Sequence, residues 1–129
     1  MNIRKFAENY MKAETEAFNT GNFTSLEKIE SADVVFHRGF QDDLVGFFAH
    51  KKDVADSRES TTDVVRQWQY LTGGGNICAL NYKGSFKSLN EKSGIPAGKT
   101  MAIESIFVLR IHGGKLVEVW ANGSSQISG

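Results

Sequence analysis

The spacing of apolar residues near the N-terminus predicts an amphipathic helix. Apolar side chains recur at steps of three and four residues from Ile3 to Phe18, with polar residues between them, as in a helix that buries one face. Glu14 interrupts this face, because it lies four residues from both Tyr10 and Phe18. Gly21 follows as a residue suited to a left-handed helix C-cap. We therefore expect a helix that carries one carboxylate on its buried side.

Two short segments and a longer helix are predicted next. Thr24 and Glu27 have the spacing of a capping box, which predicts a short helix that continues to Ile29. Residues 33–38 combine β-branched and apolar side chains in a pattern typical of a strand. Residues 43–58 return to helical spacing and predict a further helix.

Beyond this helix, apolar and polar side chains alternate, as they do in strands with one buried face. The pattern predicts one hairpin of residues 62–71 and 77–88 and a second of residues 100–111 and 115–126, each around a glycine-rich turn. The order of helix, helix, strand, helix and then antiparallel strands indicates the α+β class, with the helices on one face of a curled sheet. We find no repeat or linker, so residues 1–129 form a single domain.

Composition and charge exclude several classes of function. The chain has 15 Lys and Arg residues and 15 Asp and Glu residues, so it carries no net field that would attract nucleic acid or anionic lipid. No apolar run is long enough to span a membrane, and the N-terminal residues do not resemble a secretory signal. Cys78 is the single cysteine, which excludes an internal disulfide and fits a reducing compartment. We expect a cytoplasmic protein.

Four stretches match a known family in their order and spacing: Ala17–Asn22, Asp33–His37, Gly94–Lys99 and Leu109–Trp120. Together they resemble the SnoaL-like (polyketide cyclase-like) family of the NTF2-like superfamily, over nearly the whole chain. The resemblance implies a cone-shaped, curved antiparallel sheet, closed by the N-terminal helices around a mostly apolar cavity. It also implies homodimers that form through the outer sheet face. Members include cyclases, ketosteroid isomerases, epoxide hydrolases, dehydratases and non-catalytic binders, so the fold does not decide the activity.

The catalytic residues of these enzymes are not matched in this chain. The resemblance places the cyclase aspartate position at Ala121, the histidine position at Phe107 and the glutamine position at Ser105. Alanine carries no titratable proton, and a phenyl ring cannot replace imidazole. The base position of the ketosteroid isomerases holds Arg38, and their tyrosine position holds Glu14. Both the cyclase and the isomerase mechanism are therefore disfavoured. The catalytic residues of the epoxide hydrolases also have no counterpart in the last two strands. The resemblance implies no cofactor.

Strand alternation and the resemblance agree on the inward-facing residues. Val117, Val119 and Ala121 share one side of the last strand, and this apolar side is expected to face the cavity. Arg66 is expected on the same inward side of its strand as the aromatic residues, although its side chain is charged. The predicted ligand-binding wall consists of Phe18, Trp68, Tyr82, Ser105, Phe107, Val119 and Ala121. Trp120 and Asn122 fall on the opposite, outer side, where they fit a homodimer interface.

Glu14 and Arg38 are the candidate catalytic residues. Burial in an apolar cavity would favour the protonated carboxyl of Glu14 and suit it to acid/base chemistry. Alternatively, Arg38 or a tyrosine hydroxyl satisfies the carboxylate, or the helix turns it to the rim. Arg38, at the end of its strand, would orient an anionic or carbonyl-bearing ligand or face solvent.

The histidines predict no metal site. His37 has the opposite parity from Arg38 and is expected to be structural, and His50 is expected to face solvent on its charged helix. With Asp42 and Asp43, these histidines have a spacing that matches no known pattern of metal ligands.

Three hypotheses of function follow. The first is a homodimeric protein whose mostly apolar pocket binds a small apolar or cyclic organic ligand. The second is a cofactor-independent isomerase, cyclase, hydratase or epoxide hydrolase-like enzyme, with Glu14 as its acid/base and Arg38 steadying the developing charge. The third is an interaction module whose cavity is filled by side chains and whose outer sheet face binds the partner.

Overall fold

The computed structural model describes residues 1–39 and 41–129 and has the predicted α+β class. Its helices are α1 (Ile3–Thr20), α2 (Thr24–Ile29) and α3 (Phe47–Ser60), with a short 3-10 helix η1 (Glu91–Ser93). Its strands are β1 (Glu30–Arg38), β2 (Leu44–Val45), β3 (Thr61–Gly74), β4 (Ile77–Ser88), β5 (Thr100–His112) and β6 (Lys115–Ser128). No helix among the described residues combines the length and the apolar composition needed to cross a bilayer.

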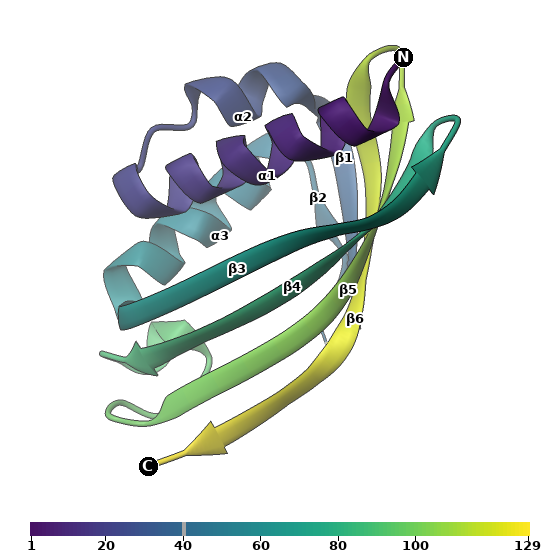
Figure 1. Cartoon of the computed structure of the whole chain (residues 1–129). Helices are drawn as coiled ribbons and strands as arrows, with labels where there is room; N and C mark the ends of the chain where they lie inside the picture. Colours follow the sequence, from purple (N-terminus) through teal and green to yellow (C-terminus); the bar gives the residue numbers. More distant parts are fainter. Residues whose placement is uncertain (40) are drawn as a thin grey trace.

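The strands form one curved sheet in the order β2-β1-β6-β5-β4-β3. The β3–β4, β4–β5 and β5–β6 pairs are antiparallel, whereas β1 runs parallel to β6. All three α-helices lie against the concave side of the sheet (Figure 1). The helices on one side and the curled sheet on the other confirm the predicted arrangement.

The predicted boundaries of α3 are wrong at its start. Leu44 and Val45 pair with β1 as the short strand β2, and the helix begins only at Phe47. Gly46 makes this junction with φ of 96°, a backbone conformation that residues with a Cβ rarely adopt. The apolar residues that suggested a longer helix therefore belong to two elements.

The capping box predicted at Thr24 is also wrong. Thr24 lies inside the first turn of α2, and the N-cap residue Phe23 makes no side-chain cap hydrogen bond. Asn22 is bonded to this turn instead, because its Oδ1 accepts from the backbone N–H of Thr24 at 3.1 Å. The left-handed cap of α1 at Gly21, with φ of 75°, is as predicted.

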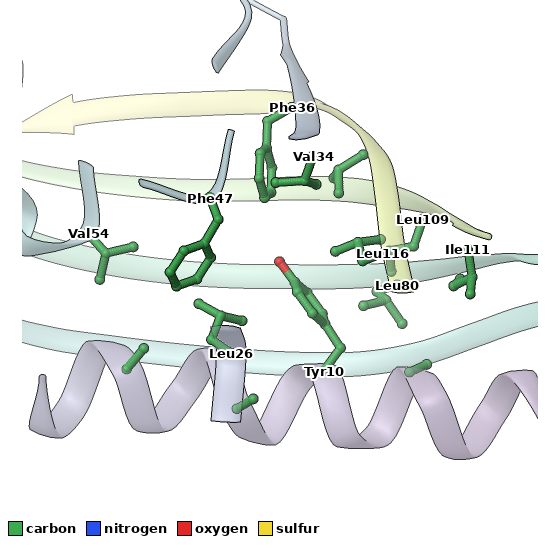
Figure 2. Packing of buried hydrophobic residues seen from close by; sticks show 14 of the residues in the cluster. Tyr10, Leu26, Val34, Phe36, Phe47, Val54, Leu80, Leu109, Ile111 and Leu116 are labelled. Carbon is green, nitrogen blue, oxygen red and sulfur yellow. The ribbon is translucent and has the colours of Figure 1, made fainter. Parts of the chain in front are cut away.

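The hydrophobic core lies between the helices and the sheet. Tyr10 projects from α1 into this cluster, toward residues from the other helices and the strands (Figure 2). Completely buried members include Leu26 of α2, Leu80 of β4 and Leu109 of β5. Each such aliphatic side chain contributes about 1.5–3 kcal/mol through burial. The core therefore fixes α1 and α2 on the sheet and positions the residues of α1 that border the remaining space.

A β-bulge in β6 corrects the predicted orientation of Val117. The β5–β6 pairing shifts by one residue, so that Leu116 lies opposite Ile111. Leu116 is completely buried as a result, and Val117 is only half-buried. An extra residue in one strand interrupts alternation, which is why extrapolating parity from Val119 back to Val117 fails.

Strand β6 approaches β5 closely at Gly123. A Cβ at this position would overlap the backbone carbonyl of Glu104 and lie 2.6 Å from the Cα of Ser105. Because these are backbone atoms, a side chain could be accommodated only by moving the two strands apart. Gly123 therefore permits the tight curvature of the sheet beside the cavity.

We predict that Gly123→Ala lowers the free energy of unfolding by about 1–3 kcal/mol, the usual cost of overpacking. The control is Gly74→Ala, because a Cβ on Gly74 would meet no described atom within 4 Å. Urea unfolding measures both variants, and the control should stay within about 0.5 kcal/mol of the wild type. Equal stability of the two variants would contradict the close approach.

Candidate functional site

A cavity of about 490 Å³ opens between the helices and the concave face of the sheet. Its volume is in the range of small-molecule sites. The structure places the following residues of the predicted wall around it: Phe18, Trp68, Tyr82, Ser105, Phe107 and Ala121. Glu14 and Arg38 also border the cavity. Val119, by contrast, is completely buried in the core cluster.

Aromatic side chains form one wall of the cavity. The ring centroid of Trp68 lies 4.7 Å from that of Tyr82 and 5.0 Å from that of Phe107. The planes of the Trp68 and Phe107 rings meet edge-on, at 72°. These rings come from β3, β4 and β5, whose register places Trp68 opposite Tyr82 and Leu80 opposite Phe107. The wall offers flat apolar surfaces suited to contact with a planar ring.

Glu14 forms a buried ion pair with Arg66 at the edge of this wall. Nη2 of Arg66 donates to Oε1 of Glu14 at 2.6 Å, and the two side chains are only 9% and 6% exposed. Nε1 of Trp68 donates to the other oxygen, Oε2, at 3.0 Å. Arg66 and Trp68 are two residues apart on β3 and therefore share a face. One strand thus supplies both donors to a carboxylate on α1.

The expected partners of Glu14 are therefore corrected. The sequence suggested Arg38 or a tyrosine hydroxyl, whereas Arg66 and Trp68 hold the carboxylate. Phe18 covers the pair, with its ring centroid 3.7 Å from Cζ of Arg66. Nη1 of Arg66 is buried and has no hydrogen-bond partner among the described residues. The ring face of Phe18 offsets this in part through a cation–π contact.

Tyr82 extends the ion pair into the cavity. Its hydroxyl oxygen accepts from Nε of Arg66 at 3.1 Å, which leaves the hydroxyl hydrogen available to a ligand. Burial raises the pKa of Tyr82 and outweighs the opposing effect of the nearby Arg66 charge. The phenol therefore stays protonated at neutral pH and is a hydrogen-bond donor.

A glycine gives the Tyr82 side chain its position. Gly84 lies opposite Arg66 in the β3–β4 pairing. A Cβ on Gly84 would overlap the Tyr82 hydroxyl and lie 2.7 Å from Cζ of the phenol. Because Gly84 has no side chain, the ring of Tyr82 can lie along the strand and reach the guanidinium.

Arg38 lies elsewhere on the cavity wall, at the end of β1. Its Nε and Nη2 donate to the backbone carbonyl of Asp42 at 3.0 and 2.9 Å, and Nη1 lies 3.7 Å from Oδ1 of Asp53. The side chain is 28% exposed. Arg38 is thus held by its own chain segment, apart from the hydrogen bonds of Glu14.

The expectation that His50 faces solvent is wrong. His50 is only 8% exposed and forms part of the cavity wall. Its Nδ1 lies 3.0 Å from Oε1 and 2.8 Å from Oε2 of Glu30, the first residue of β1. Its ring contacts that of Phe36, with centroids 4.3 Å apart. Its neighbours Lys51 and Lys52 are exposed, whereas Asp53 also borders the cavity, close to Arg38.

His37 lies on the outer face of the sheet. Its Nδ1 is 3.0 Å from Oδ2 of Asp43, and its Nε2 is 2.5 Å from Oε2 of Glu118. Its ring stacks on that of Trp120, with the ring centroids 5.4 Å apart. The hydrogen bond to Glu118 raises the pKa of His37. His37 and His50 thus have different partners, and the described residues contain no group of three or more side chains placed to hold a metal.

Sequence reasoning missed Arg66 and His50 as cavity residues. Arg66 stood out as a charge that shared the parity of Trp68, and this was the one available sign of its role. His50 lies four residues before Val54, a core residue of the same helix face. That spacing was a sign of burial that the adjacent lysines and aspartate obscured.

The comparisons with known proteins agree with this architecture. The sequence profile of the SnoaL-like polyketide cyclase family matches residues 8–123. No curated protein matches the chain significantly.

Three solved structures illustrate the likeness in fold. TsrD from Streptomyces laurentii superposes with a TM-score of 0.78 at 16% identity, covering 94% of this chain and 90% of that one. SalBIII superposes with a TM-score of 0.73 at 13% identity, covering 95% of this chain and 93% of that one. SalBIII is an epoxide hydrolase/cyclase-like enzyme with a role in pyran ring formation in the polyether salinomycin. An NTF2-like protein of unknown function from Exiguobacterium sp. 255-15 gives 0.68 at 14%, covering 92% and 98%.

Proposed function

Because this chain belongs to the SnoaL-like polyketide cyclase family, we propose that its cavity binds a flat, mostly apolar cyclic molecule through one carbonyl or hydroxyl oxygen. The observation that carries the proposal is the Tyr82 hydroxyl. It borders the cavity, it already accepts from Arg66, and its own hydrogen is free for a ligand oxygen. The rings of Trp68 and Phe107 beside it would contact the faces and edges of the ligand.

The side chains at the family's catalytic positions support binding over the family's cyclase chemistry. Ala121 and Phe107 border the cavity, and the resemblance assigns them the positions of the cyclase acid and histidine. Neither can transfer a proton. The interaction module, our third hypothesis, required an interior filled by side chains. The open volume of about 490 Å³ argues for a ligand instead.

An enzyme with Glu14 as acid/base and Arg38 as charge stabiliser stays a prediction. Both oxygens of Glu14 already accept hydrogen bonds, and Arg38 is bonded to the backbone of Asp42. These contacts favour a positioning role for Glu14. It holds Arg66, which in turn orients the Tyr82 hydroxyl.

We predict that Tyr82→Phe weakens binding of β-tetralone, a bicyclic ketone, by about fivefold, the effect of one hydrogen bond of about 1 kcal/mol. Tetralin, the hydrocarbon of the same shape, should bind the variant and the wild type equally. Isothermal titration calorimetry measures both ligands. Tyr70→Phe is the matched control, because Tyr70 lies on the neighbouring strand and packs against the core.

Three outcomes would count against the proposal. If β-tetralone does not bind the wild type, the proposed ligand class is wrong. If Tyr82→Phe weakens the binding of tetralin as much as that of β-tetralone, the tyrosine contributes shape and not a hydrogen bond. If the affinity for the ketone is unchanged, Tyr82 does not contact its oxygen.

We also propose that two copies pair through the outer sheet face. Trp120 and Ile106 are 39% and 43% exposed there, and Asn122 lies opposite Ile106. Exposed aromatic residues of this kind are enriched in interfaces.

In sedimentation equilibrium at micromolar concentration we expect a dimer, which Trp120→Glu converts to a monomer. A monomeric wild type would refute this interface.

A further inference from the structure

His50, from the first turn of α3, is a further polar residue on the cavity wall, apart from the Glu14–Arg66 pair and Arg38. Its partner is Glu30, from the start of β1, which does not line the cavity itself. Both carboxylate oxygens of Glu30 lie within 3.0 Å of Nδ1 of His50. The side chain of Glu30 is completely buried, and that of His50 is 10% exposed.

Burial of Glu30 is unfavourable unless the carboxylate is paired. Burial raises the pKa of Glu30, and the hydrogen bond and charge of His50 oppose this shift. Oε2 of Glu30 is buried without a hydrogen bond to the described residues, so the bond from His50 to Oε1 is the one that compensates for lost water. To donate to Glu30, His50 must carry a hydrogen on Nδ1. In the neutral imidazole the lone pair is then on Nε2.

The free edge of the imidazole is available to a ligand. His50 borders the cavity, and Nε2 makes no hydrogen bond to the described residues. Phe36 contacts the ring, with its centroid 4.3 Å away, and restricts its rotation. A carboxylate that orients a histidine whose second nitrogen stays open is the arrangement of a general base.

We propose that His50, positioned by Glu30, removes a proton from the carbon next to the carbonyl group of the bound ligand. The inference rests on the proposed function, in which a cyclic ketone occupies the cavity. The electron pair of the broken C–H bond moves into an enolate, whose oxygen accepts from the Tyr82 hydroxyl. Nε2 holds the proton, and Glu30 stabilises the imidazolium. Return of the proton to the same or a conjugated carbon completes a proton exchange or an isomerisation without any co-reactant.

The test uses β-tetralone in deuterium oxide, with loss of the proton signals next to its carbonyl followed by NMR. The wild type should accelerate this exchange in a saturable way. His50→Gln should slow exchange at saturating ketone by about 100-fold or more, as for loss of a general base, and leave the dissociation constant unchanged. His37→Gln is the matched control, because His37 is also bonded to a carboxylate but lies on the outer face. It should exchange at the wild-type rate.

Glu30 is a positioning residue, so its test separates rate from binding. Glu30→Gln should reduce the saturated exchange rate without changing the affinity for β-tetralone. Added imidazole should restore exchange to His50→Ala, which has lost the base and kept the cavity. Nitrogen NMR of the wild type should show the hydrogen of neutral His50 on Nδ1.

The outcomes distinguish this inference from the proposed function. A wild type that does not bind β-tetralone refutes the proposed function and, with it, this substrate class. Binding without accelerated exchange, or exchange by His50→Gln at the wild-type rate, refutes the base alone. If the His50 variants do not fold, the wild-type spectrum decides, because a hydrogen on Nε2 of neutral His50 would overturn the proposal.

Discussion

The buried ion pair between Glu14 and Arg66 connects helix α1 to strand β3 beside the cavity. Two charges removed from water are costly, and losing one partner leaves the other uncompensated. The pair is therefore a constraint on its surroundings. Phe18 must cover the guanidinium, Trp68 must reach the second carboxylate oxygen, and Tyr82 must accept from Nε. The position of the Tyr82 hydroxyl hydrogen in the cavity follows from this constraint.

The rest of the cavity is arranged around that polar edge. Glycines at positions 84 and 123 let the Tyr82 ring and strand β5 come close to their neighbours. His50, paired with Glu30, lies on another part of the wall and does not share these hydrogen bonds. The cavity thus contains a donor and a base, supplied by different elements, within a mostly apolar enclosure. Ala121, where the resemblance led us to expect the position of the cyclase acid, borders the cavity and carries no charge.

The sequence could predict the faces of the elements more readily than their partners. Helical spacing placed Glu14 inward, because positions four residues apart share a side of a helix. The partner Arg66 lies 52 residues away, and the register of β3 against α1 is set by the folded core. The error at Val117 came from a bulge, which alternation alone does not reveal. His50 was misjudged because the adjacent Lys51 and Lys52, which are exposed, suggested a solvent-facing segment.

The geometry of the cavity depends most on coupling between Glu14 and Arg66, which a double-mutant cycle measures directly. Urea unfolding of Glu14→Gln, Arg66→Met and the double variant gives the three free energies. We predict that each single change costs about 3–5 kcal/mol. The double variant should cost less than the sum, with a coupling energy of about 2 kcal/mol or more. Strictly additive losses would mean that the two side chains stabilise the fold independently, which would contradict the ion pair as the constraint on the cavity.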